Sequence, residues 1–210
     1  MQIKPKPSRD SVVNAARRAQ IVKAAIDTIA ELGYDRASFA RITERAGLSS
    51  PRLISYHFAG KDDLIKAIVE DVYRAGAAYM TGRMEAQATA AGRLRAYLEA
   101  NLEFLRDHPR EIAALTEVGP HLRDRSGAPY TSAGHQEPGV RGLEELLREG
   151  QRGGEFRDFD PRAMAVMIRG AIEAAASRVS GPHALDLASY AREAVTTFLA
   201  ATAATGEPPR

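Results

Sequence analysis

The stretch that decides the fold is Ser38–Phe58, which reads SFARITERAGLSSPRLISYHF. Ser38 has a short hydroxyl side chain that suits the N-cap of a helix, and the spacing of apolar residues predicts that helix over Phe39–Ala46. Gly47 follows directly and can adopt the positive φ that ends a helix. We therefore expect a short helix that stops at a glycine hinge.

A second short helix is expected beyond the hinge, running to about Phe58. Ser49 or Ser50 can cap it, and Pro51 is tolerated in a first helical turn. Two helices joined by a three- or four-residue turn that contains glycine form a helix-turn-helix. Apolar residues on both helices are expected to form the small core that they share: Phe39, Ile42, Ala46, Leu48, Leu53 and Ile54.

The outer face of the second helix is then polar and carries short side chains. It presents Ser49, Ser50, Arg52 and Ser55. Small hydroxyl side chains let a helix approach base edges closely, and arginine can form two hydrogen bonds to guanine in the major groove of DNA. The pattern favours a segment that contacts double-stranded DNA.

Helices also flank this stretch on both sides. A helical pattern starts at Arg17, with Ile21, Ala25 and Ile29 at helical spacing, and Gly33 caps its C-terminus. We find no run of alternating polarity that would indicate a strand, so the fold class is all-α. Further helices are expected over Lys61 to about Met80, Gly92–Asp107, a short segment to about Leu122, Val140–Arg152, Pro161–Val179 and Ala184–Ala203, with Arg123–Gly139 as the longest loop.

Charge is distributed unevenly along the chain. Residues 1–61 carry 11 Lys and Arg against 5 Asp and Glu, whereas the remainder carries 18 against 22. A basic N-terminal third joined to a mildly acidic remainder suggests an anionic partner for the first part. The domain organisation that we expect is a flexible basic arm over 1–16, a helix-turn-helix domain over 17–61, a helical domain over 62–204 and a disordered tail over 205–210. The arm is either a frayed terminus or a segment that touches DNA.

The same residues resemble the tetracycline-repressor (TetR) family. The resemblance covers residues 17–65 and rests on Gly33–Tyr34, Ser38–Phe39, Ala46–Ser49 and Tyr56–Phe58, followed by Lys61 and Leu64. It implies a three-helix DNA-binding domain followed by a larger helical-bundle domain for ligand binding and dimerisation. It also implies a repressor that a small molecule releases from a palindromic operator.

Functional roles carry over from that resemblance position by position. Ser38, Tyr56, His57 and Lys61 would contact the DNA backbone, while Arg41 could reach either backbone or groove. The alternatives are that Tyr56 is core, that His57 is a surface residue without a contact, and that Lys61 only starts the fourth helix.

Two departures from the family pattern affect these assignments. The interval from Gly47 to Phe58 is one residue longer than the commonest family spacing, so each role on the second helix could shift by one position. Thr43 stands where the family often has alanine, at the tight crossing of the two helices.

The resemblance further implies a homodimer formed by the last two long helices and a ligand site in the bundle. The expected dimer face carries Met164, Met167, Ile168, Ile172, Ala175, Val179, Leu187, Tyr190, Ala191, Val195 and Phe198. Tyr73, Phe104, Met164 and Met167 are candidates to line an apolar cavity for an effector; the alternative for each is an ordinary place in the core.

Several function classes are excluded or disfavoured. The chain has no cysteine, which excludes disulfides, cysteine nucleophiles and cysteine-ligated metals and fits the cytoplasm. No signal peptide or membrane span is expected, and the G-x-S-x-G, P-loop and H-E-x-x-H motifs are absent. We assign no catalytic residue, metal or cofactor. The remaining alternative is a helical ligand-binding or adaptor protein whose helix-turn-helix is only structural.

Overall fold

The computed structural model describes residues 9–123, 132–179 and 183–204, and these are almost entirely helical. Their β-structure is limited to isolated bridging, such as the antiparallel pair Phe156 and Ala203. The expected all-α fold is confirmed. None of the helices within the described ranges is both long and apolar enough to cross a bilayer. The chain divides into two compact units, unit 1 with residues 1–72 and 113–129, and unit 2 with residues 73–112 and 130–210.

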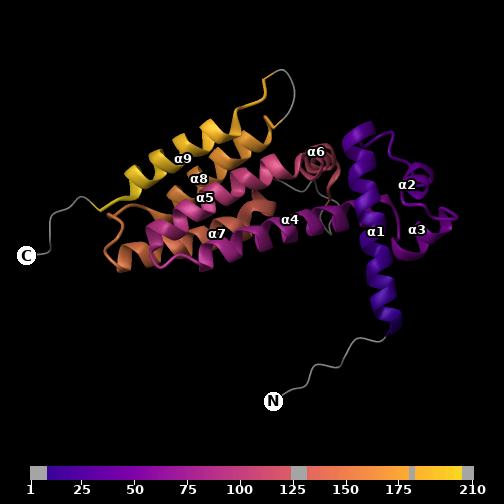
Figure 1. The fold of residues 1–210 in the computed structure, drawn as a ribbon, viewed down its shortest axis with the longest axis horizontal. Helices are drawn as coiled ribbons and strands as arrows, with labels where there is room; N and C mark the ends of the chain where they lie inside the picture. The colour runs from indigo at the N-terminus through magenta and orange to yellow at the C-terminus, as the bar shows by residue number, and fades with distance from the viewer. Residues whose placement is uncertain (1–8, 124–131, 180–182, 205–210) are drawn as a thin grey trace, which may run out of the picture. The chain divides into compact units, whose positions relative to one another are not determined.

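Unit 1 is built on the helix α1 (Arg9–Leu32), with α2 (Phe39–Arg45) and α3 (Arg52–His57) lying against the same side of it (Figure 1). The first part of α4 (Lys61–Glu85) and the end of α6 (Pro109–Val118), with the 3₁₀ turn Gly119–His121, complete the unit. Its core consists of fully buried aliphatic and aromatic side chains from α1 to α4: Ile21, Ile29, Ile42, Ile54, Phe58, Leu64, Ile65 and Ile68.

The prediction of an N-terminal arm over residues 1–16 is wrong for residues 9–16. Helix α1 begins at Arg9, eight residues before the helical start expected at Arg17, so residues 9–16 are helix. Pro7 is the last proline before α1, and the chain can turn helical soon after it. Residues 1–8 lie outside the described residues, as does the tail over 205–210.

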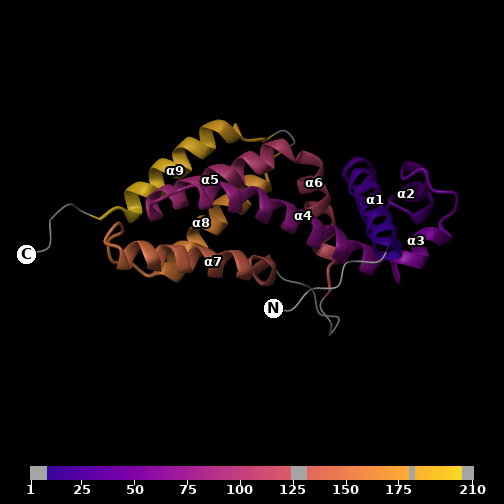
Figure 2. The ribbon, with the colours of Figure 1, turned by 60° about the horizontal axis from the view of Figure 1, so that its bottom comes forward.

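Unit 2 contains the rest of α4 together with α5 (Ala90–Asp107), α7 (Ser132–Arg152), α8 (Pro161–Ala176) and α9 (Leu187–Thr202). Helix α8 lies between α7 and α9, and α5 packs against all three (Figures 1 and 2). One apolar cluster joins these helices, with Leu94, Leu98, Leu143, Leu147, Ala165 and Ile168 among its most buried members.

The loop predicted over Arg123–Gly139 is wrong in its second half. Helix α7 begins at Ser132 and includes Pro138 inside it. A proline within the first turns of a helix removes a hydrogen bond without ending the helix, which is why the sequence pattern misplaced this boundary. The other boundaries differ by a few residues: α8 ends at Ala176 rather than Val179, and α9 starts at Leu187 rather than Ala184.

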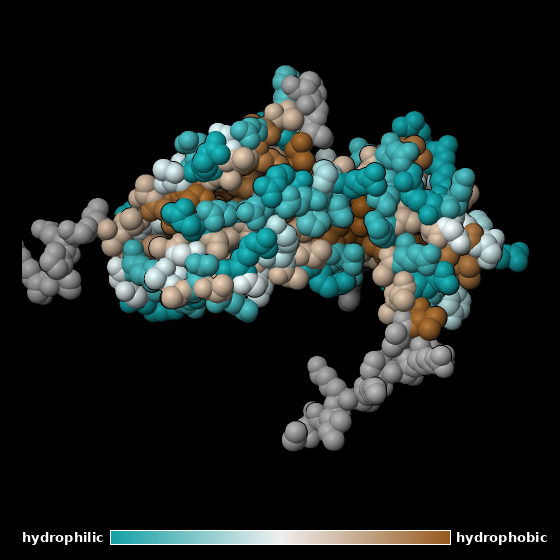
Figure 3. Space-filling model, in the orientation of Figure 1, coloured by the Kyte–Doolittle hydropathy of each residue, from teal (hydrophilic) through white to brown (hydrophobic). Residues whose placement is uncertain are grey.

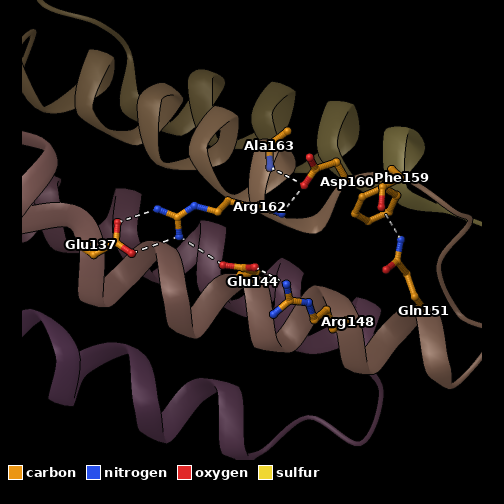
Figure 4. Close-up of polar contacts among 8 residues, drawn as sticks. All are labelled: Glu137, Glu144, Arg148, Gln151, Phe159, Asp160, Arg162 and Ala163. Atoms are coloured by element: carbon orange, nitrogen blue, oxygen red, sulfur yellow. Dashed lines mark hydrogen bonds and ion pairs between the residues drawn. The ribbon is translucent and has the colours of Figure 1, made fainter.

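Helices α7 and α8 are joined by a polar network as well as by the core (Figure 4). Arg162 of α8 donates to Glu137 at 2.9 Å and to Glu144 at 3.3 Å, and Glu144 also pairs with Arg148 one turn along α7. Arg162 holds the pKa of the Glu137 carboxyl below its usual range through this hydrogen bond. Asp160 caps α8 by accepting from the backbone N–H of Arg162 and Ala163. The network fixes the register of α7 against α8.

Candidate nucleic-acid interface

The turn between α2 and α3 is a glycine-capped helix end, as predicted. Gly47 has a φ of +63°, a conformation that residues with a β-carbon rarely adopt. Its N–H donates to the carbonyl of Glu44 and the N–H of Leu48 donates to the carbonyl of Thr43. These two hydrogen bonds form a Schellman motif and satisfy carbonyls that the end of α2 leaves open. The chain therefore leaves α2 in one defined direction.

Thr43, which replaces the commoner alanine, fits the crossing of the two helices. It is buried, and its hydroxyl donates to the carbonyl of Phe39 at 2.6 Å. A buried hydroxyl with its hydrogen bond made carries little penalty. The substitution is therefore accommodated without opening the helix pair.

Side chains of α1 hold the ends of both short helices. Gln20 donates to the carbonyl of Ala46 at 2.7 Å, at the C-terminus of α2. Arg18 donates to the carbonyl of His57 at 2.6 Å, at the C-terminus of α3, and its guanidinium lies 4.1 Å from the centre of the Phe58 ring. Terminal carbonyls carry the negative end of the helix dipole, so a cation is stabilised there. Sequence analysis did not single out Arg18 or Gln20, because their partners are distant in sequence.

Helix α3 presents one face to solvent. Arg52 and Ser55 are exposed, and Tyr56 is 76% exposed, which excludes a core role for it. Ile54 anchors the opposite face in the core of unit 1. Leu53 was predicted to be core, and this is wrong: it is 36% exposed. Its position beside Ile54 on a short helix turns it outward, so the exposed face is less polar than expected.

The start of α3 lies later than the sequence suggested. The connection Ala46–Pro51 is longer than the three- or four-residue turn expected, and α3 begins at Arg52. Ser50 still caps the helix, because its hydroxyl accepts from the N–H of Arg52 at 3.1 Å. Ser49 is exposed in the connection rather than on the helix.

The N-terminus of α2 carries two further predicted residues. Ser38 caps the helix as expected, its hydroxyl accepting from the N–H of Arg41 at 3.4 Å. Arg41 is exposed but bends back, since its Nη1 donates to the carbonyl of Arg36 at 2.8 Å. Both side chains thus lie at the surface, and both already hold local backbone groups.

Lys61 is engaged within unit 1. Its ammonium donates to the carbonyl of Tyr34 at 2.8 Å and lies 3.7 Å from the centre of the Tyr34 ring. His121 stacks on the same ring at 3.7 Å, and Glu117 accepts from the N–H of Tyr34 at 3.1 Å. Burial, and then the negative charge of Asp62, raise the pKa of the Tyr34 hydroxyl. The Lys61 ammonium keeps N–H donors beyond the one given to Tyr34.

His57 lies at the end of α3 and is half-buried. Its ring meets the Tyr56 ring edge-on, with centroids 5.1 Å apart. Burial lowers the pKa of His57, and the charges of Arg18 and Arg17 lower it further. Near neutral pH the imidazole is therefore uncharged, and it can donate one hydrogen bond to an anion without contributing a full charge.

Comparison with known proteins finds a family match for the helix-turn-helix region. Residues 21–68 match the family described as bacterial regulatory proteins, tetR family. The DNA-binding region of the chain is therefore of the tetR type. Among curated TetR-type relatives, it is 33% identical over 100 residues to the HTH-type transcriptional regulator BetI of Cronobacter sakazakii, covering 47% of this chain and 49% of BetI. It is 31% identical over 93 residues to BetI of Escherichia coli, covering 43% and 47%. The chain thus spans about half the length of the curated relatives that it matches.

Solved structures share the fold of this chain over most of its length. The fatty acid degradation regulator FadR from Bacillus halodurans matches with a TM-score of 0.74 at 21% identity, over 98% of this chain and 100% of FadR. AibR, solved in complex with isovaleryl coenzyme A and operator DNA, matches with a TM-score of 0.70 at 20% identity, over 86% of this chain and 97% of AibR. At these identities the likeness establishes the fold alone.

In unit 2, the four predicted ligand residues separate into two pairs. Phe104 and Met164 are buried in unit 2, and Phe104 stacks on His108 with ring centroids 4.1 Å apart. Tyr73 and Met167 are exposed, Met167 by 54%. Side chains that face solvent do not line an interior cavity of a single chain. Only Phe104 and Met164 are therefore placed to do so.

A surface groove of about 420 Å³ runs between α5 and α9. Apolar surface shows between the hydrophilic side chains of these helices (Figure 3). The groove is lined by Arg95, Glu99, Leu102, Glu103, Arg106, Leu187, Ala188, Ala191, Arg192, Val195 and Thr196. On α5 these residues occupy the side opposite to Tyr97 and Phe104, as the helical spacing of 100° per residue requires. The groove is thus separate from the interior face of α5.

Proposed function

We propose that this chain is a sequence-specific DNA-binding transcriptional repressor that a small molecule releases from its operator. The observation that carries the proposal is the exposed face of α3, which Ile54 anchors and Arg18 and Gln20 fix in place, within the region that matches the tetR family. A rigidly held short helix with an exposed arginine suits insertion into the major groove. We place this activity in the cytoplasm and assign no catalysis.

The proposed contacts fall into a base-reading set and a backbone set. Arg52 reads guanine, the hydroxyls of Ser49, Ser50 and Ser55 approach base edges, and Leu53 joins them because an exposed leucine suits the thymine methyl group. Phosphates are contacted by Ser38, Tyr56, His57 and Lys61, while Arg41 serves either set. Phosphate contacts position the protein and base contacts supply the specificity.

We further propose a homodimer on a palindromic operator. One domain makes too few phosphate contacts for tight binding, and a two-fold dimer doubles them. The expected dimer face is divided in the single chain: Met164, Ile168, Ile172, Ala175 and Val195 are buried within it, whereas Met167 is exposed. Val166, which sequence analysis did not name, is 52% exposed beside Met167 on α8. These two large apolar side chains favour α8 as part of the contact.

The deciding experiment is a salt titration of DNA binding with variants. Sequence-selective binding whose affinity falls steeply with salt supports a regulator, and no binding at low salt would support the structural adaptor instead. Arg52→Ala should relax selectivity at one base position per half-site. Lys61→Ala should weaken all sequences about equally and reduce the salt slope by about 1 for each phosphate that the lysine neutralises. Arg178→Ala, an exposed arginine in unit 2, is the matched control.

A separate measurement keeps the Lys61 result interpretable. Lys61 also binds the carbonyl of Tyr34, so its loss could loosen unit 1. Urea denaturation of Lys61→Ala and of the wild type would show whether the variant remains folded at the assay temperature. If Arg52→Ala and Lys61→Ala lost the same affinity for specific and for random DNA, the division into base-reading and backbone contacts would be contradicted.

The proposal also includes a small-molecule effector. The structural relative AibR was solved with isovaleryl coenzyme A and operator DNA together, and the fold of this chain resembles it over 86% of its length. We propose that unit 2, which holds Phe104 and Met164 inside it, is the effector-binding part.

A further inference from the structure

Arg169 of α8, which is partly buried, reaches across to α5 within unit 2. Nη1 of Arg169 lies 3.1 Å from the hydroxyl oxygen of Tyr97 and 3.3 Å from Oδ1 of Asn101, both on α5. Nε of Arg169 is fully buried and has no hydrogen-bond acceptor among the described residues. Buried N–H groups are almost always paired, and an unpaired one costs free energy. Tyr97 and Asn101 therefore bind Arg169 through Nη1 only, and an acceptor for its Nε is missing from the described residues.

The positive charge of Arg169 has no ion-pair partner within residues 9–123, 132–179 and 183–204. The carboxylates through which α7 meets α8, Glu137 and Glu144, are bound by Arg162 and Arg148 instead (Figure 4). A partly buried guanidinium is stabilised by a counter-charge or by a full set of acceptors. Within those ranges Arg169 has two neutral acceptors for its five N–H groups.

The two acceptors are themselves rigidly placed. Tyr97 is 8% exposed and Asn101 is 6% exposed. Nδ2 of Asn101 donates to the carbonyl of Tyr97 at 2.7 Å, which turns its Oδ1 towards Arg169. Because the Tyr97 oxygen accepts from Arg169, its hydroxyl hydrogen remains available, and no acceptor for it is found in the described part of the chain. Arg169 and Tyr97 together offer donors and no negative charge.

The surroundings of this donor pair are apolar. Tyr97 and the neighbours of Arg169 on α8, Ile168 and Ala165, belong to one buried cluster with Leu94 and Leu98 of α5. Gly139 of α7 lies beside Nε, where a β-carbon would stand 3.6 Å from it. A ligand that reaches the guanidinium from within unit 2 therefore meets hydrocarbon on several sides.

We propose that the effector is an oxyanion on an apolar body, and that Arg169 and Tyr97 bind its charged group. The inference deepens the proposed function, since it assigns the chemical class of the effector of unit 2. Both a carboxylate and a phosphate monoester present oxygens that accept from a guanidinium and a phenol. The apolar body replaces water against the cluster formed by α5 and α8.

The test uses sodium hexanoate as the probe on the full chain. Titration calorimetry and thermal denaturation should show saturable binding and a rise in melting temperature, since a ligand of the native state stabilises it. Hexyl phosphate, 1-hexanol and hexylammonium chloride carry the same apolar body. Binding of hexanoate identifies a carboxylate and binding of hexyl phosphate alone identifies a phosphate; either result supports the proposal. Binding of neither anion, or equal binding of the alcohol or the amine, would overturn it.

Variants connect the binding to the named residues. Arg169→Met keeps an unbranched stem and removes the charge and the N–H donors, and should weaken anion binding about 10- to 100-fold, the usual value of a charged hydrogen bond. Arg178→Met, just beyond the end of the same helix and exposed, should bind as the wild type. If Arg169→Met does not fold, Tyr97→Phe removes one hydroxyl and should still weaken binding several-fold. Unchanged affinity in the folded variant would refute the assignment.

Failure of this inference can be distinguished from failure of the proposed function. Operator binding is measured on the same preparations without any anion. Loss of DNA binding with intact hexanoate binding would remove the proposed repressor role and leave the anion site. Specific DNA binding without anion binding would refute the site and leave the repressor.

Discussion

Replacing Gly47 by alanine should destabilise unit 1 through the backbone alone. The residue has a φ of +63°, and a β-carbon built on it meets no atom within 4 Å. No steric clash therefore contributes, and the change isolates the cost of holding alanine in the left-handed region. That cost is about 1–2 kcal/mol, offset by about 0.4–1 kcal/mol because alanine also restricts the unfolded chain.

The net expectation for Gly47→Ala is a loss of about 1 kcal/mol in the free energy of unfolding. For a chain of this length the melting temperature should fall by about 2–4 °C. Gly47→Asn should lose less, because asparagine tolerates positive φ. Gly82→Ala in α4 has neither a positive φ nor a neighbour within 4 Å, and should be neutral or stabilising by up to about 1 kcal/mol.

The assay is urea denaturation of the three variants, combined with fluorescence anisotropy on operator DNA. Because the Schellman hydrogen bonds set the direction of the chain after α2, DNA affinity should fall in the order of the stability losses. A Gly47→Ala protein as stable as the wild type, or an equal loss for Gly82→Ala, would refute the strain argument.

Three further variants test other parts of the structure. Gly150→Ala would place a β-carbon 2.1 Å from the Phe156 ring and should lower the free energy of unfolding, measured in urea, by about 1–3 kcal/mol. Gly142→Ala on the same helix brings its β-carbon within 4 Å of no atom and is the control. Equal stabilities of the two variants would contradict the packing of Phe156 on Gly150. Glu144→Gln should lower the free energy of unfolding by about 1–2 kcal/mol, because the buried carboxylate pairs with Arg162 and Arg148. The figure is modest because both arginines are half-exposed. Glu145→Gln, at the exposed neighbouring position, should leave the free energy of unfolding nearly unchanged. His57 has a lowered pKa in the folded chain, so its contribution to stability is present above the pKa of the unfolded state and is lost as the pH falls below it. The urea midpoint should therefore drop between pH 7.5 and 5.5 by less in His57→Gln than in the wild type. Equal drops in the two proteins would exclude the effect.

The local features of the DNA-binding region were predictable because each depends on neighbours in sequence. The N-cap at Ser38 and the positive φ at Gly47 follow from residue type and position. The burial of Ile42 and Ile54 follows from helical spacing. Leu53 was misassigned because a six-residue helix is too short for its periodicity to show which of two adjacent apolar residues faces inward.

The sequence by itself determined that the chain is helical, where the hinge lies and which residues surround it, since capping, glycine conformation and apolar spacing act over a few residues. Only the tertiary structure decided the long-range contacts, such as Arg18 on the carbonyl of His57 and Lys61 on Tyr34. The same holds for Arg169, whose Nε is buried and whose Nη1 meets Tyr97 only because α8 packs against α5. The physical reason is that a side chain on one helix finds its partner through the packing of the helices, and neither residue's own neighbours along the chain encode that meeting.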